Sequence, residues 1–182
     1  MKALVLSLSL LLGSSLVSAI ELPDEASVPG GIAHLPLQGD TQPKVFYRNH
    51  QVMVLSATDT RYEHQADWVA LIGIPLSAKP GTQNATVDGK PITFRIKDKQ
   101  YKEQRLVIKN KRKVNPNKLD MKRITREKKE ITKALASWTD ADGQPAVIRL
   151  LKPAEGPYSS PFGLRRFFND QPRNPHSGLD IA

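Results

Sequence analysis

Short apolar runs between residues 40 and 109 predict a small β-rich domain. Trp68–Ile74 is a continuous apolar run, which is typical of a strand buried on both faces. Gln104–Ile108 predicts one more strand. The aromatic residues of this region fall within the strand pattern, and we expect them to belong to the core rather than to a glycan-binding platform. They are Tyr47, Phe94 and Tyr101.

Two hairpins are expected in the same region. Asp88-Gly89 is a strong two-residue turn signal, because both central positions of a type I′ turn need a positive φ. It separates Thr86-Val87 from Ile92–Ile96. Arg48–His50 is a second turn candidate, lying between the strand candidates Lys44–Tyr47 and Gln51–Ser56.

The segments on either side of this region carry weaker strand signals. Residues 20–40 contain Pro23, Pro29 and Pro36 together with Gly30-Gly31, which indicates an extended lead-in rather than a regular element. Near the C-terminus, Asp140–Gln144 predicts a polar turn and Val147–Leu151 a strand. Residues 158–182 show little periodicity and are expected to be loop-like.

A basic stretch after Lys109 leads into a predicted amphipathic helix, Pro116–Trp138, with Asn115 as its N-cap. Its apolar residues recur at helical spacing: Met121, Ile124, Ile131, Leu135 and Trp138. A basic amphipathic helix could lie on a membrane surface. We favour a connecting helix packed on a neighbouring domain, because Glu127 and Glu130 dilute the positive charge. The fold class is therefore mainly β with one connecting amphipathic helix.

The first 19 residues predict a signal peptide. Lys2 precedes the apolar stretch Ala3–Leu12, and Val17-Ser18-Ala19 fits the small-x-small rule for cleavage. The apolar stretch is shorter than the roughly 20 residues that a spanning helix needs, so stable membrane insertion is not expected. The chain has no cysteine, which excludes disulfides, a thiolate metal site and a lipid-modified cysteine. We expect a periplasmic or secreted protein.

The formal net charge of +9 fits either attraction to a polyanion or a solubilising surface. Export makes nucleic acid an unsuitable partner. An acidic cell-wall surface and anionic lipid both remain compatible with the charge.

His176 and Asp180 are the strongest candidates for metal ligands. In a regular strand, side chains four residues apart share a face but lie about 13 Å apart. Two zinc ligands must each lie about 2.0–2.2 Å from one ion. The backbone must therefore bend between them, and Gly178 permits such a bend because it has no Cβ.

The segment that ends in this pair resembles the start of the LytM/lysostaphin-like zinc endopeptidase domain. The resemblance is carried by three strings, Ser159-Ser160-Pro161-Phe162-Gly163-Leu164-Arg165-Arg166, Phe168-Asn169 with Pro172-Arg173, and Pro175-His176-Ser177-Gly178-Leu179-Asp180-Ile181-Ala182. Upstream, three further strings are similar to the N-terminal domain that precedes the peptidase in some exported members. They are Val28–Ala33, Trp68–Leu76 and Lys113–Pro116.

The resemblance implies a division of the chain into four parts. These are a signal peptide at 1–19, an N-terminal β-rich domain with its lead-in at 20–109, a basic linker and helix at 110–140, and the beginning of an antiparallel β peptidase domain at 141–182. It implies a zinc metallopeptidase that hydrolyses peptide cross-links of bacterial peptidoglycan. His176 and Asp180 map onto two zinc ligands of the family's HxGxD motif.

In that family a third ligand and a catalytic His come from an HxH motif, and the sequence contains no HxH. We therefore expect the chain to be an incomplete fragment, without catalytic residues of its own and inactive by itself. Arg165, Asn169 and Arg173 are weak candidates for substrate binding, with a structural role in the loop as the alternative for each. His34, His50 and His64 are expected to be ordinary surface or turn residues rather than zinc ligands.

Two other hypotheses stay open at this point. The first is a non-catalytic protein that binds peptidoglycan or regulates a hydrolase. The presence of both ligand residues argues against it. The second is a short gene product whose β-domain folds while its tail, with Phe162, Phe167 and Phe168, stays unpacked and protease-sensitive.

Overall fold

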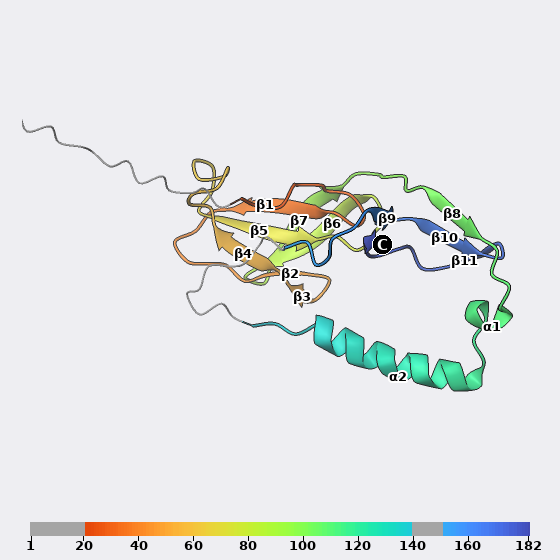
Figure 1. Cartoon of the computed structure of the whole chain (residues 1–182). Helices are drawn as coiled ribbons and strands as arrows, with labels where there is room; N and C mark the ends of the chain where they lie inside the picture. The colour runs from red at the N-terminus through yellow and green to blue at the C-terminus, as the bar shows by residue number, and fades with distance from the viewer. Residues whose placement is uncertain (1–20, 140–150) are drawn as a thin grey trace, which may run out of the picture.

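The computed structural model describes residues 21–139 and 151–182. It is mainly β, with one long helix, which confirms the predicted fold class (Figure 1). The elements are β1 (Ile32–Leu37), β2 (Val45–Tyr47), β3 (His50–Gln51), β4 (Met53–Ser56), β5 (Trp68–Gly73), β6 (Gly81–Val87), β7 (Lys90–Ile96), β8 (Glu103–Leu106), α1 (Lys111–Val114), α2 (Lys118–Leu135), β9 (Tyr158–Ser160), β10 (Arg165–Phe168), β11 (Gln171–Pro172) and β12 (Asp180–Ile181).

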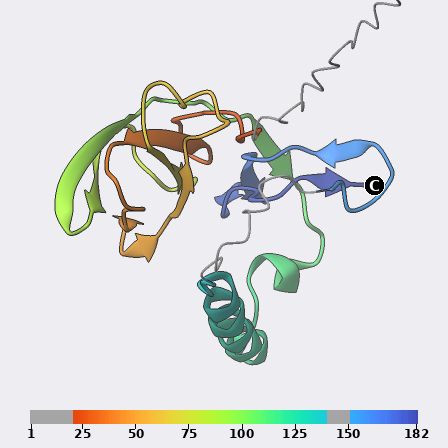
Figure 2. The same ribbon diagram turned by 90° about the vertical axis from the view of Figure 1, so that its left-hand side faces the viewer.

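Residues 32–96 form two antiparallel sheets around the main core. One sheet has the order β1-β5-β4 and the other β3-β2-β6-β7. The predicted strand Trp68–Ile74 is confirmed as β5, the central strand of the first sheet. Its apolar run is needed there, because Val69 and Ile72 are fully buried. Figure 2 shows these two sheets as one body, apart from α2 and the C-terminal strands.

Both predicted hairpins are present. Asp88 and Gly89 have φ values of 49° and 78° and join β6 to β7. Arg48 and Asn49 have φ values of 50° and 64° and join β2 to β3. The second turn thus has two residues rather than the three expected. The strand predicted at Gln51–Ser56 is divided at Val52, so β3 and β4 lie in different sheets.

The expectation of a lead-in without regular structure is wrong for Ile32–Leu37. This segment is β1 and pairs with all six residues of β5. Pro36 is compatible with a strand here because β1 is an edge strand, where a missing N–H removes no bond from the sheet.

The helix begins later than the sequence pattern suggested. Asn117, not Asn115, is the N-cap of α2, and its side chain accepts a hydrogen bond from the Asp120 N–H while the Asp120 carboxylate accepts one from the Asn117 N–H. Arg112 of α1 donates to Asp120 over 2.6 and 2.7 Å. The hydrogen bond from Arg112 lowers the pKa of the Asp120 carboxyl group.

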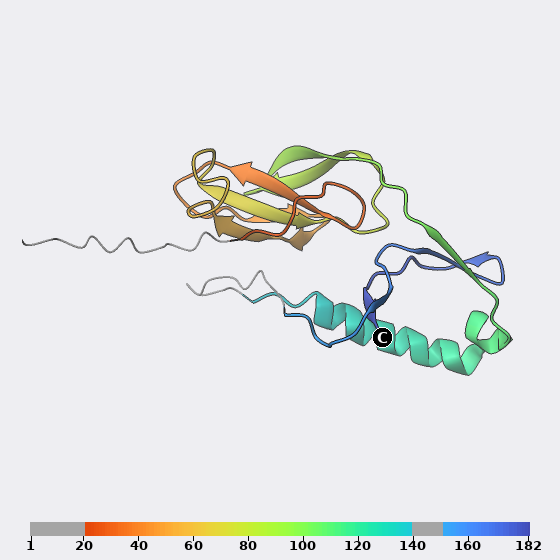
Figure 3. The same ribbon diagram turned by 45° about the horizontal axis from the view of Figure 1, so that its top comes forward.

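The expected packing of this helix on a neighbouring domain is also not observed. No residue of α2 is buried, and Ile131 and Leu135 are 58% and 82% exposed. Figure 3 shows α2 outside the two sheets of the N-terminal domain. Within the described ranges, no helix is long and apolar enough to cross a membrane.

The C-terminal segment is not simply loop-like, as predicted, but contains four short strands. β10 and β11 form a hairpin through Asn169 and Asp170, whose φ values are 49° and 61°. β12 pairs with β9, and β10 pairs in parallel with β8. The predicted strand Gln104–Ile108 is therefore present as β8, but its partner lies in the C-terminal segment. The predicted signal peptide, the turn Asp140–Gln144 and most of the predicted strand Val147–Leu151 lie outside the described residues.

The aromatic residues take different places. Tyr47 is 4% exposed, and Phe94 packs edge-on against it with 5.2 Å between ring centroids, so both belong to the core as expected. Tyr101 lies outside the strands and contacts the C-terminal segment instead.

His34 is a buried titratable group of β1. It is 7% exposed, and its Nδ1 lies 2.9 Å from Arg61 Nη2 and 3.2 Å from the Tyr62 hydroxyl. Burial and then the charge of Arg61 lower its pKa below the ordinary value of 6.5, although Glu25 acts in the opposite direction. The folded protein therefore favours the neutral imidazole.

Ile72→Ala should lower the free energy of unfolding by about 2–5 kcal/mol, because it opens a cavity at a fully buried position. Ile131→Ala is the matched control on the exposed face of α2, and it should change the value by no more than about 0.5 kcal/mol. Urea unfolding followed by tryptophan fluorescence measures both. Equal losses would contradict the described burial.

His34→Gln should make stability less sensitive to acid. Since the folded pKa of His34 is lowered, the unfolded chain takes up the proton first as the pH falls below 6.5, and stability is lost in that range. Glutamine does not titrate and can still accept from Arg61, so this loss should shrink in the variant. His64→Gln, at an exposed position, is the matched control, and the acid-dependent loss that arises from His34 should remain in it.

Candidate functional site

The structure brings the two predicted metal ligands together. His176 Nε2 lies 3.1 Å from Asp180 Oδ1, so the chain does bend between them. Asp180 begins β12, which pairs with β9 opposite Ser160, and this pairing fixes its position. His176 precedes the bend and is 9% exposed, whereas the side chain of Asp180 is 51% exposed. The His176 side chain is therefore buried, and the Asp180 carboxylate is open to solvent.

Hydrogen bonds define which nitrogen of His176 carries a proton. Nδ1 lies 2.9 Å from the carbonyl oxygen of Pro161. A carbonyl oxygen can only accept, so Nδ1–H is the donor, and Nε2 of the neutral ring presents a lone pair. Asp180 Oδ1 is also an acceptor. Two acceptors 3.1 Å apart repel each other unless a proton or a cation lies between them.

Zinc fits this pair of atoms. Two ligands of a tetrahedral zinc ion, each about 2.1 Å from the metal, lie roughly 3.4 Å apart, close to the observed separation. Zinc-bound histidines commonly donate their other N–H to a carbonyl or carboxylate, as His176 does to Pro161. The described residues contain no group of three or more potential ligands, so they provide only this pair. In particular, His34, His50 and His64 form no such group with it.

Arg166 and Ser160 contact the His176–Asp180 pair. Arg166 Nη2 lies 3.8 Å from Asp180 Oδ2 and donates to Ser160 Oγ over 3.3 Å. Ser160 Oγ lies 3.4 Å from His176 Nδ1, a longer contact than that of the Pro161 carbonyl. Arg166 Nε is buried without a hydrogen-bond partner among the described residues. The guanidinium group is thus well placed to hold the Asp180 carboxylate in position.

The three weaker candidates from the sequence contact other parts of the chain. Arg165 forms an ion pair with Glu103 at 3.3 Å. Asn169 donates to the Ile108 carbonyl and accepts from the Ile108 N–H. Arg173 donates to the Val114 carbonyl over 2.8 Å. All three therefore connect the C-terminal segment to residues 103–114, and their role in substrate binding stays a prediction.

From the sequence we named Arg165 as a candidate and not its neighbour Arg166, which is the one that lies near Asp180. Successive side chains of a strand point to opposite faces, so only one of two adjacent arginines in β10 can face the pair. Recognising Arg165–Phe168 as a strand would have provided this signal, but its four residues show no clear alternation of apolar and polar positions.

The loop that carries the site also contacts the N-terminal domain. The Gly163 N–H donates to the His176 carbonyl over 2.7 Å, and the His176 N–H donates to the Leu164 carbonyl over 2.9 Å. Tyr101 packs on the same loop, and its hydroxyl donates to the Pro29 carbonyl over 2.7 Å. Gly163 leaves room for the tyrosine ring, because a Cβ there would lie 2.1 Å from two of its carbons. Tyr101 thus links the N-terminal domain to the loop that fixes His176.

Gly163→Ala should disrupt the site locally, because the new Cβ would overlap the Tyr101 ring at a φ of +87°. Hydrogen exchange should show lost protection at the amides of Gly163 and His176, with the amides of β5 still protected. Gly89→Ala is the matched control, since its φ is +78° but no atom lies near its Cβ. It should leave the His176 amide protected. Equal exchange at His176 in both variants would mean that Tyr101 does not hold the loop.

Two comparisons with known proteins found matches to peptidase family M23. Residues 25–99 match the N-terminal domain of peptidase family M23. No curated protein matches the chain. A crystal structure from Pseudomonas aeruginosa, described as a "putative peptidase M23", is 34% identical, with a TM-score of 0.58. The match covers 86% of this chain, so it extends beyond residues 25–99, and the chain spans 54% of that structure. The chain is therefore related to peptidase family M23 and carries a match to that family's N-terminal domain.

Proposed function

We propose that the chain is part of a zinc metalloendopeptidase that hydrolyses peptide cross-links of bacterial peptidoglycan. The observation that carries the proposal is the arrangement of His176 and Asp180, in which two acceptor atoms face each other at 3.1 Å. This arrangement suits a bound cation. The relation to M23 peptidases, a family that is generally zinc-dependent, supports zinc as that cation.

Bound zinc would polarise the scissile carbonyl and lower the pKa of a water molecule. The residues of this chain would hold and orient the site. His176 would bind through Nε2, because the Pro161 carbonyl occupies Nδ1–H. Asp180 would bind through a carboxylate oxygen and reduce the positive charge of the site. Arg166 would keep that carboxylate from rotating away.

Two ligands do not complete a catalytic zinc site, which usually has three protein ligands and a water molecule. The third ligand and the histidine that transfers protons would come from residues outside those described. The HxH motif of the resembling peptidases is the expected source. The chain spans 54% of the related crystal structure.

The proposed place of action is outside the cytoplasm, in the periplasm or the medium. The predicted signal peptide at residues 1–19 supports export, and a chain without cysteine offers no thiol for a lipid anchor. Peptidoglycan is the proposed partner, and the formal net charge of +9 suits an acidic wall surface.

His176→Ala and Asp180→Ala in the full-length protein should each abolish release of dye-labelled fragments from purified peptidoglycan. We expect a loss larger than the roughly 10–100-fold that removal of an outer-shell partner costs. Arg166→Gln should fall within that 10–100-fold range, because it leaves both ligands in place. Zinc content, measured by mass spectrometry of the purified protein, should fall in parallel with activity.

His64→Ala is the matched control, because it removes an exposed histidine far in sequence from the pair. It should keep both zinc and activity. A chelator should abolish activity of the parent protein, and added zinc should restore it. Full activity of His176→Ala after chelation and exchange into metal-free buffer would contradict the proposal.

A further inference from the structure

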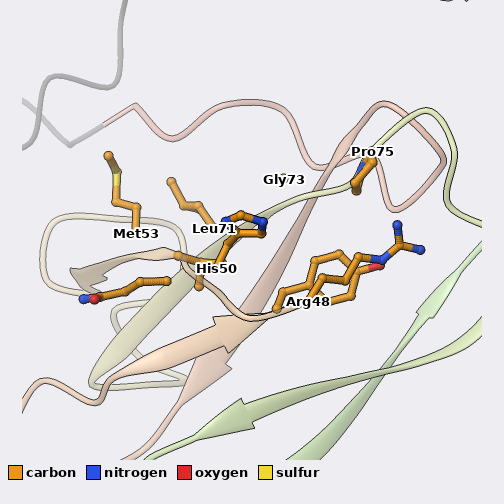
Figure 4. A pocket seen from close by; sticks show the side chains of 9 residues that line it. Arg48, His50, Met53, Leu71, Gly73 and Pro75 are labelled. Carbon is orange, nitrogen blue, oxygen red and sulfur yellow. The ribbon is translucent and has the colours of Figure 1, made fainter. Parts of the chain in front are cut away.

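The N-terminal domain contains a cleft that plays no part in the proposed zinc site. Its volume is about 520 Å³, within the range of about 300–1,000 Å³ typical of ligand pockets. It lies between the β2–β3 hairpin and the end of β5 (Figure 4). The residues that line it are Tyr47, Arg48, His50, Gln51, Val52, Met53, Leu71, Gly73 and Pro75.

The charge of this cleft is one-sided. Arg48 and His50 are the ionisable basic residues of the lining, and the lining contains no Asp or Glu. Arg48 lies over the Tyr47 ring, with its guanidinium carbon 5.4 Å from the ring centroid. Among the described residues, no carboxylate forms an ion pair with Arg48. A fixed positive charge therefore borders the cleft without a negative partner in this part of the chain.

The backbone holds Arg48 in an unusual conformation. It is the first central residue of a two-residue hairpin turn, with a φ of 50°. That position favours Asn, Asp or Gly, because other side chains are strained at positive φ. Pairing of Tyr47 with His50 closes the turn and fixes the position of the Arg48 backbone. The turn thus presents an arginine where local stability alone would favour asparagine.

The floor of the cleft offers apolar contacts and open backbone. Leu71 of β5 pairs with Met53, the first residue of β4. The pairing of β4 with β5 ends here, so the edge of β5 beyond Leu71 has no partner from β4. Gly73 is exposed, and no atom lies within 4 Å of the position that a Cβ would take. Figure 4 shows Leu71, Gly73 and Pro75 following one another along the cleft. A chain lying there could approach the backbone of Gly73 closely.

We propose that this cleft binds a peptide segment that ends in a free carboxylate. The planar guanidinium of Arg48 matches a carboxylate, to which it can donate two parallel hydrogen bonds. The apolar side chains of Met53, Leu71 and Pro75 contact the side chain next to that carboxylate, and the exposed Gly73 accommodates the ligand's backbone. A phosphate fits less well, because Arg48 is the one permanently charged residue of the lining.

This site shares no residue with the His176–Asp180 pair, and it goes beyond the proposed peptidase function. Binding here needs neither zinc nor further ligands. Failure of the cleft to bind peptide leaves the zinc proposal untouched, and loss of zinc binding at His176 leaves the cleft untouched.

The test is a titration of the ¹⁵N-labelled protein with acetyl-alanyl-alanine, its C-terminal amide and inorganic phosphate, each followed by NMR. The free acid should shift the backbone N–H signals of Arg48, Gln51 and Gly73. The peptide with a C-terminal amide should bind at least about tenfold more weakly, because it cannot form the charged hydrogen bonds with Arg48. Phosphate should cause smaller shifts. Equal binding of acid and amide, tighter binding of phosphate, or no shift with the acid would overturn the proposal.

Arg48→Asn tests the same claim without risk to the fold. Asparagine suits the positive φ of this turn, so the variant should melt at the same or a higher temperature while its affinity for the free acid falls at least about tenfold. Arg95→Gln removes an exposed arginine of β7 and should leave affinity unchanged. Unchanged affinity in Arg48→Asn, or an equal loss in both variants, would overturn the proposal.

Discussion

The position of His176 depends on its hydrogen bonds to residues 161–164. Its ring donates to the Pro161 carbonyl, its backbone N–H to the Leu164 carbonyl, and its own carbonyl accepts from the Gly163 N–H. Together these bonds fix the place of the imidazole, its tautomer and the direction of its Nε2 lone pair. Asp180 lies close to Nε2 because β12 pairs with β9, the strand that directly precedes residues 161–164. The proposed zinc binding depends on these hydrogen bonds, because they orient His176.

The N-terminal domain belongs to the same arrangement and is more than an attached module. Phe162, next to Pro161, lies against the place where Gly30 of the domain lacks a side chain, and Tyr101 fits against Gly163. Gly30 has a φ of +83°, which suits glycine and lets the two parts approach closely. The core around Ile72 supports the lead-in turn at Pro29-Gly30, since the Gly30 N–H donates to the Ile74 carbonyl. Changes in this domain can therefore reach the loop that fixes His176.

Local and strongly patterned features could be predicted from the sequence. The run at Trp68–Ile74 and the Asp88-Gly89 turn are examples, because a buried strand and a type I′ turn each need particular residues over a short stretch. The His176–Asp180 pair was found from its spacing together with the surrounding string.

The strand at Ile32–Leu37 was not predicted, because a proline such as Pro36 normally argues against a strand. Proline is tolerated in an edge strand, but the sequence of one segment does not show which strand lies at the edge of a sheet. The C-terminal strands were missed because they are two to four residues long and depend on distant partners such as β8. The exposed apolar face of α2 was mistaken for a packed one, since periodicity shows that a face exists but not what covers it.

The most direct test of the central claim is the ¹⁵N NMR spectrum of the His176 ring as zinc is added to the metal-free protein. We expect Nδ1 to keep its proton throughout, because the Pro161 carbonyl accepts it. The Nε2 signal should move from the position of a free lone pair to that of a metal-bound nitrogen. Asp180→Asn should weaken this response, because a neutral amide is a poorer ligand than a carboxylate. A ring that is protonated on Nε2, or an Nε2 signal that zinc does not move, would contradict the account.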